Sequence, residues 1–343
     1  MEDRHRRRNS RLIPDYIIHR RGHPADSKGT SKNDYKMKRI LILTAAAAAI
    51  CACSKTEVKN GTAPETDGPV PIEFNAGVPS TKAPITNGSS VTAGIAGWQV
   101  AQEGTVDFTA APAWNTTIGF TANSTPQSVT WTVQQYYPSN GDVVYMRAWY
   151  PSGTLADNKV TFENTDGSTD AMLLNSTDGY VSGSKTDHTG KNLPFGHCTA
   201  QIRFNITADA TVETGTTLEY IKIQKATLPV GFDLSANSVT ASVETTLTVP
   251  TEEDFDITGD GAEDKVLGTV MIMPMAELVI EVATSATTYA PAKVTITNEG
   301  STSTELLAGT AYDINIKITR NEITLTASVE EWKEAGSGEI TLD

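Results

Sequence analysis

Apolar and polar residues alternate strictly in two stretches near the C-terminus, on either side of the polar residues 320–322. Residues 312–318 carry tyrosine or isoleucine at every second position, and residues 323–329 carry isoleucine, leucine, alanine and valine in the same way. A period of two puts all the apolar side chains of a strand on one face. We therefore predict an antiparallel hairpin over residues 307–332, whose apolar face needs a second sheet to cover it. Trp332 is expected to close the end of that core.

Similar alternation, between loops rich in Gly, Asn, Ser and Pro, runs through most of the chain after residue 69. No apolar stripe of period 3.6 is found outside residues 1–52, and Thr and Val are abundant, as strands prefer. The pattern predicts an all-β fold of two tandem antiparallel β-sandwich domains, residues 70–192 and 193–343. Further strands are expected at 94–100, 128–133, 143–150, 171–174, 218–223, 266–273, 278–282 and 293–297.

Each predicted domain opens with an alternating stretch. The first domain begins with a short strand that has Val70, Ile72, Phe74 and Ala76 on one face. The second domain begins with a long strand. Its inward set is expected to be Cys198, Ala200, Ile202, Phe204 and Ile206, and its polar set to be Thr199, Gln201, Arg203 and Asn205.

The first 52 residues are expected to be a leader. Residues 1–36 are basic and irregular, and Met37 begins a charged segment followed by the apolar run 40–50. That run has the length of a secretory signal and is too short to span a bilayer. Its end resembles a lipoprotein lipobox, with Cys53 as the residue to be acylated, so Met37 is the expected start. A nucleic-acid-binding basic arm is the alternative for residues 1–36, and a secretion signal directly behind it argues against that function.

Removal of this leader changes the charge balance. It takes 12 of the 27 basic and 5 of the 41 acidic residues, which leaves 15 basic and 36 acidic residues and a formal net charge of −21 over residues 53–343. Such a chain repels nucleic acid and anionic lipid surfaces. Cys198 remains as the only cysteine besides Cys53, so no internal disulfide is expected despite export. Residues 53–69 are polar and are predicted to be a flexible tether.

Several short motifs together resemble the bacterial fimbrillins that build type V fimbriae. The motifs succeed one another along nearly the whole mature chain: Ile72-Glu73-Phe74 and then Thr81-Lys82-Ala83, the segment 193–204, Val270-Met271-Ile272-Met273-Pro274, residues 307–312, and Val329-Glu330-Glu331-Trp332. The resemblance implies a two-domain β-sandwich lipoprotein that serves as stalk, anchor or tip subunit. It also implies donor-strand assembly, in which a protease removes the first strand and a neighbour's strand fills the groove.

Lys82 is the candidate processing site. It is the only Lys or Arg between Lys59 and Arg147, and it comes after the first strand in a loop with Gly and Pro. A cut after Lys82 would separate Ile72 and Phe74 from the rest of the fold. Fimbrillins often carry Arg at the matching position, so an Arg-specific protease is not expected to cut here. The alternative is that the strand stays in place and the protein acts as an unprocessed anchor or monomer.

Candidate catalytic and metal-binding motifs are weak. His197 and Cys198 are neighbours on a predicted strand and would point to opposite faces, so they do not form a nucleophile–base pair. Asp256, Thr258 and Asp260 begin like a calcium loop, but the twelfth position lacks the bidentate Glu. A solvated acidic turn is the favoured interpretation there, and a weak structural Ca²⁺ site is the alternative. We expect no enzyme activity and no cofactor.

Aromatic residues cluster in the first domain, namely Trp131, Tyr136, Tyr137, Trp149 and Tyr150. Most of them are expected to fill a sandwich core. Aromatic rings lying flat on a sheet would instead bind sugars, so a surface glycan-binding lipoprotein is the alternative function.

The sequence favours a non-catalytic fimbrial subunit or fimbrillin-like adhesin, anchored by lipid in the outer membrane and exposed at the surface. Its expected partners are other fimbrial subunits and host or bacterial surface ligands, but not nucleic acid.

Overall fold

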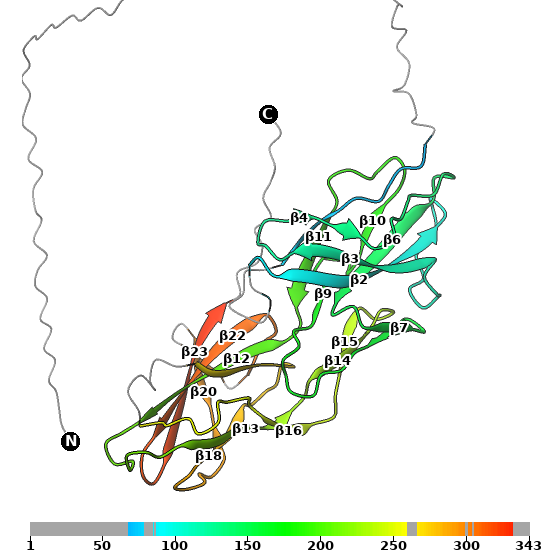
Figure 1. Ribbon diagram of the computed structural model, residues 1–343. Helices are drawn as coiled ribbons and strands as arrows, with labels where there is room; N and C mark the ends of the chain where they lie inside the picture. The colour runs from blue at the N-terminus through cyan, green and yellow to red at the C-terminus, as the bar shows by residue number, and fades with distance from the viewer. Residues whose placement is uncertain are drawn as a thin grey trace, which may run out of the picture. The chain divides into compact units, whose positions relative to one another are not determined.

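Figure 1 shows the computed structural model of the chain, which describes residues 68–78, 85, 87–258, 266–298, 301–303 and 305–331. All the regular secondary structure in that part of the chain consists of β-strands, which confirms the all-β class. The described strands form four sheets, of nine, six, four and four strands. The same residues include no helix long and apolar enough to cross a membrane.

The nine-stranded sheet is built from the N-terminal half of the described chain. Its path runs β4-β1-β11-β9-β6-β2-β3-β5, with β10 paired to β6. Its strands are β1 (Asn75–Gly77), β2 (Ser90–Val100), β3 (Trp114–Thr121), β4 (Gln127–Ser128), β5 (Thr130–Trp131), β6 (Val143–Tyr150), β9 (Met172–Leu174), β10 (Val181–Gly183) and β11 (Asn192–His197).

This sheet curls back on itself. Strands β4 and β5 stand at opposite ends of the path, yet only Val129 separates them in the chain. The two ends are therefore brought together, and the sheet encloses one core to which β1, β2, β3, β6, β9 and β11 all contribute buried apolar residues. The predicted single strand 128–133 is wrong in detail, because β4 and β5 divide this stretch between the two ends of the sheet.

The C-terminal half forms a two-layer sandwich. One layer is the six-stranded sheet β17-β12-β22-β23-β20-β21, and the other is the four-stranded sheet β16-β13-β18-β19, among the described residues. The two sheets share one core. The strands are β12 (Ala200–Ala208), β13 (Leu218–Ala226), β16 (Thr245–Thr248), β17 (Val266–Ile272), β18 (Val279–Thr284), β19 (Ala292–Lys293), β20 (Thr295–Asn298), β21 (Ser301–Ser303), β22 (Thr310–Ile318) and β23 (Ile323–Glu331).

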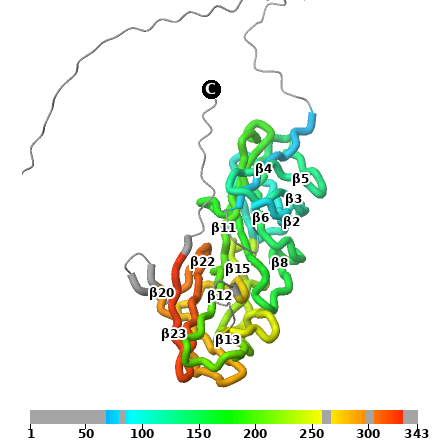
Figure 2. The backbone as a smooth tube through the Cα atoms, turned by 60° about the vertical axis from the view of Figure 1, so that its left-hand side comes forward, coloured from blue at the N-terminus to red at the C-terminus, as the bar shows by residue number. Residues whose placement is uncertain are grey.

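The C-terminal hairpin is confirmed as the pair β22 and β23. Ile316 lies opposite Leu325 in the antiparallel register, and both side chains are buried, whereas Thr324 is exposed. Strand β22 also pairs in parallel with β12 along its other edge, so that Arg203 lies opposite Asp313. Figure 2 shows β12 beside this hairpin. Trp332 lies outside the described residues.

The predicted faces of the strand after residue 198 are only half right. Ile202, Phe204 and Ile206 are buried as expected, but β12 begins at Ala200, and Cys198 packs with a different core. The polar set does not face water: Thr199, Gln201 and Arg203 are also buried. Strand β12 lies between β17 and β22, and its second face is covered, so alternation in the sequence did not mean exposure.

A fourth sheet joins strands from both halves of the chain. Its order is β15-β14-β8-β7, where β7 (Thr154–Ala156) and β8 (Lys159–Thr161) come from the first half, and β14 (Pro229–Asp233) and β15 (Ser238–Ala241) from the second. Val160 pairs with Phe232, and both are buried beside Trp149. The division into two sandwich domains remains a proposal. By strand pairing, the N-terminal sheet extends through His197, so the predicted boundary near residue 193 falls inside β11.

Candidate functional site: the leading strand and its trough

Residues 70–78, which belong to the first described segment of the chain, lie inside the N-terminal sheet, and we call them the leading strand. Its inward residues are buried, as the alternation predicted. They are Val70, Ile72, Phe74, Ala76 and Val78, with exposed fractions between 0 and 9%. Glu73, on the other face, is exposed, and Asn75 is partly exposed. Only residues 75–77 count as regular strand β1, which is shorter than the predicted strand over 70–76.

One edge of the leading strand is bonded to residues 123–137. The backbone N–H of Ile72 donates to the Gln135 carbonyl at 2.9 Å, and the N–H of Val129 donates to the Phe74 carbonyl at 3.2 Å. The side-chain amide of Gln134 donates to the Ile72 carbonyl at 3.0 Å. Strand β1 then pairs antiparallel with β4.

The other edge is bonded to β11 and the residue before it. The N–H of Asn75 donates to the Lys191 carbonyl at 3.1 Å, and β1 runs parallel to β11, with Ala76 opposite Leu193. The leading strand is therefore an interior strand between β4 and β11, although it contains the first strand of the described residues. In Figure 1 it is the blue segment that passes beside both strands. It completes the closure of the curled sheet.

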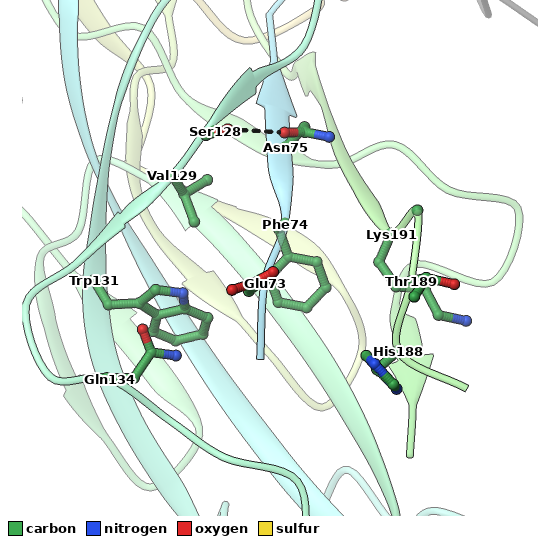
Figure 3. Close-up of a pocket in the computed structure, with 11 residues that line it drawn as sticks. Glu73, Phe74, Asn75, Ser128, Val129, Trp131, Gln134, His188, Thr189 and Lys191 are labelled. Carbon is green, nitrogen blue, oxygen red and sulfur yellow. Dashed lines mark hydrogen bonds between the residues drawn. The ribbon is translucent and has the colours of Figure 1, made fainter. Parts of the chain in front are cut away.

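A trough with a volume of about 500 Å³ lies over the outer face of the leading strand. Its floor is formed by residues 73–75 of that strand. Ser128, Val129, Trp131 and Gln134 line one wall, and residues 188–191, from the turn before β11, line the other. Figure 3 shows these side chains around the shared space, with Glu73 at its centre.

Several of the polar groups around the trough already have partners, among them the Gln134 amide described above. The Lys191 ammonium lies 2.8 Å from a carboxylate oxygen of Asp187, and the Ser128 hydroxyl donates to the side-chain oxygen of Asn75 at 3.3 Å. The indole Nε1 of Trp131 is buried and has no hydrogen-bond partner among the described residues. Sequence reasoning did not find this trough, because its lining comes from three segments that no local pattern connects.

The processing and lipidation candidates, Lys82 and Cys53, lie outside the described residues. Both remain predictions. The leading strand ends at Val78, whose N–H donates to the Asn123 carbonyl at 3.1 Å, and β2 begins at Ser90.

A family model described as fimbrillin-like matches residues 81–332, which is most of the chain. The chain belongs to the fimbrillin-like family. The matched region begins after the leading strand and spans both halves of the described fold. Members of this family are fimbrial structural proteins, which places the chain at the cell surface. A comparison with curated protein sequences gives no match.

This fimbrillin-like protein is also similar to solved structures. A candidate cell adhesion protein from Bacteroides uniformis is 18% identical with a TM-score of 0.52, over 78% of this chain and 99% of that one. The tip fimbrial protein Mfa3 from Porphyromonas gingivalis, with a C-terminal truncation, is 11% identical with a TM-score of 0.43, over 77% of this chain and 100% of that one. At 18% identity, the similarity to the Bacteroides uniformis protein shows a shared fold and no more specific property.

The candidate calcium turn closes through its own hydrogen bonds. The Asp256 carboxylate accepts bonds from the N–H and the hydroxyl of Thr258, at 2.8 and 2.7 Å. The same hydroxyl accepts the N–H of Gly215 at 2.9 Å. Asp260 lies outside the described residues, and the described part of the chain holds no group of three or more His, Cys, Asp or Glu side chains that could bind a metal ion.

His197 and its neighbours form a buried polar cluster around Asp170. One carboxylate oxygen of Asp170 lies 2.7 Å from His197 Nδ1, and the other accepts the hydroxyl of Thr199 at 3.0 Å. The His197 side chain is buried at the end of β11, where this carboxylate holds it. Burial, and secondarily the charge of Asp170, raises the pKa of the Cys198 thiol to about 12. The thiol therefore stays protonated at neutral pH and is a poor nucleophile.

The aromatic residues divide between core and surface. Trp149 and Tyr137 are buried, as core packing predicted. Tyr136 is 50% exposed, and Trp131 is partly buried, with its ring 6.1 Å from that of Phe74. Trp131 is thus the one member of the predicted cluster that lines the trough.

Proposed function

We propose that this fimbrillin-like protein is a surface fimbrial subunit or adhesin, and that its leading strand is released so that a strand of a neighbouring subunit takes its place. The observation that carries this proposal is the interior position of residues 70–78. They are hydrogen-bonded on both edges and bury every second side chain, yet they lie at the front of the fold. A segment with these properties leaves a preformed groove when it departs.

The free energy that holds the leading strand in that groove can be estimated from its buried side chains. Val70, Ile72, Phe74 and Val78 each contribute about 1.5–3 kcal/mol of transfer free energy, or about 6–12 kcal/mol together. Their departure would also leave unpaired backbone groups on β4 and β11, the two strands that now flank β1. An empty groove is therefore strongly unfavourable, and an extended strand with apolar residues at alternate positions would fill it.

Release requires a cut between the leading strand and β2. Lys82 is the proposed site, since it is the only basic residue between Lys59 and Arg147. A cut there detaches the strand from the fold, and it also detaches the fold from Cys53. Acylation of Cys53 is the proposed anchor to the outer membrane, which would hold uncut protein at the cell surface. In this proposal the protein acts without a cofactor and without catalysis, and its partners are other fimbrial subunits.

Limited trypsin treatment with subsequent N-terminal sequencing tests the proposal. The expected result is a new N-terminus at Ala83, loss of the leading strand from the folded part, and the appearance of oligomers on a native gel. The control is Lys82→Gln, which removes the cleavage site and should stay monomeric under the same treatment. A cut at Lys82 after which the strand stays bound and the protein stays monomeric would refute strand release.

A further inference from the structure

The trough over the leading strand has the size of a small-molecule site. Its volume of about 500 Å³ falls within the range of about 300–1,000 Å³ that is typical of ligand pockets. It is lined by polar groups of several kinds together with the apolar residues Phe74, Val129 and Trp131. Residues 73–75 of the leading strand form the floor: Glu73 and Asn75 face outward, and Phe74, which also belongs to the core, lies between them.

The charges around the trough argue against anionic ligands and metal ions. The Lys191 ammonium is already paired with Asp187 at 2.8 Å, and the Glu73 carboxylate adds negative charge at the floor. Among the residues that line the trough, a phosphate would therefore find no unpaired Lys or Arg side chain, and it would meet a repelling carboxylate. A metal ion would need more ligands, and no group of three suitable side chains occurs in the described residues.

A fully apolar ligand fits no better. It would cover the polar side chains of Glu73, Asn75 and Thr189 without giving them hydrogen-bond partners, which is unfavourable for each group. A suitable ligand must offer several hydroxyl or amide groups to the floor and walls. It must also present an apolar C–H face to the Trp131 side chain, which lines the trough.

We propose that this trough binds a neutral saccharide of one or two rings. Sugar hydroxyls both donate and accept, so they match the mixture of carboxylate, amide and hydroxyl groups on the floor and walls. One face of a sugar ring carries C–H groups that pack against an aromatic side chain, and Trp131 supplies that side chain. Figure 3 shows Trp131 and Gln134 on one side of Glu73, and His188, Thr189 and Lys191 on the other.

The site is complete only while the leading strand is in place, because residues 73–75 are its floor. A saccharide that binds this state but not the strand-free state shifts the equilibrium against release. At a free ligand concentration 100 times Kd, the shift is about 100-fold. The effect of the saccharide on release rests on the proposed function, whereas saccharide binding to the trough does not.

Binding is tested on the full chain by saturation-transfer NMR with galactose, glucose, mannose, N-acetylglucosamine, lactose and cellobiose. At least one of these sugars should bind, and Glu73→Ala and Thr189→Ala should each weaken that binding about 10-fold. Glu103→Ala is the matched control, since Glu103 is exposed and does not line the trough, and it should leave binding unchanged. Trp131→Phe keeps an aromatic ring for the core contacts and should also weaken binding. Absence of binding by all six sugars, or equal binding by the wild type and the trough variants, would overturn the proposal.

The link to strand release is tested on trypsin-treated protein. Binding should be lost once the leading strand has left, and a saturating sugar should slow that release. Binding that survives departure of the strand would overturn its role as the floor. If trypsin does not release the strand, the proposed function fails, while the NMR result on uncut protein still decides whether the trough binds sugar.

Discussion

Phe74→Ala tests most directly how the leading strand is held. The Phe74 side chain is 4% exposed and faces the core of the curled sheet, and its ring lies 6.1 Å from that of Trp131. Truncation removes the buried ring and leaves a cavity that a closely packed core fills only in part. Substitutions of this kind destabilise by about 3–5 kcal/mol. We expect that loss in the free energy of unfolding of the uncut protein.

The assay is urea unfolding monitored by tryptophan fluorescence. The matched control is Glu73→Ala, because Glu73 is the next residue on the same strand and its side chain is exposed. Its effect should stay within about 0.5 kcal/mol. The backbone hydrogen bonds of the leading strand are the same in both variants, so the difference between them reports side-chain burial alone.

The same substitution should change strand release after cleavage. If the groove holds the strand through these side chains, Phe74→Ala weakens the hold by the same 3–5 kcal/mol, which corresponds to about 100- to 4,000-fold in the equilibrium for release. The fraction of cut protein that retains the strand should fall accordingly, as measured by mass spectrometry after gel filtration. Equal stability losses in Phe74→Ala and Glu73→Ala would show that the leading strand is not held by its inward face.

Three further predictions concern other parts of the chain. Leu325→Ala should lower the free energy of unfolding by about 2–5 kcal/mol, and Thr324→Ala by less than about 0.5 kcal/mol, in urea titrations; similar losses would contradict the observed faces of β23. Cys53→Ala should move the protein from the membrane fraction to the soluble fraction, since acyl chains contribute about 0.8 kcal/mol per buried CH₂; continued membrane association would place the anchor elsewhere. Burial, and secondarily the charge of Asp187, raises the pKa of Tyr137 to about 12, above the value near 10 in the unfolded chain. The folded state therefore keeps this proton longer, and stability should fall as the pH rises between about 10 and 12. Tyr137→Phe should show a smaller fall in unfolding titrations across that range, and an identical fall would exclude Tyr137 as its source.

The alternation of apolar and polar residues determined much of this fold. It predicted the C-terminal hairpin, with Ile316 and Leu325 on the buried face, and it predicted the buried side of the leading strand at Ile72 and Phe74. The physical reason is local: successive side chains on a strand point to opposite faces, so one buried face produces a period of two without reference to the rest of the chain.

Only the tertiary structure decided which strands are neighbours. Arg203 and Asp313 are 110 residues apart, yet two hydrogen bonds of 2.6 Å join their side chains across the parallel pair β12 and β22. The period of β12 is visible in the sequence, but the burial of Gln201 and Arg203 on its second face is not. That face is buried because other segments pack over it, and a local pattern carries no record of such contacts.

The same limit applies to the candidate site. The sequence indicated that the leading strand has one apolar face, but not that it lies between β4 and β11 and closes the sheet. Nor could it indicate the trough, whose floor comes from residues 73–75 and whose walls come from residues 128–134 and 188–191. These segments meet only because the sheet curls until its ends join. The sequence therefore determined which face of the leading strand is buried, and the closure of the sheet determined what its other face can bind.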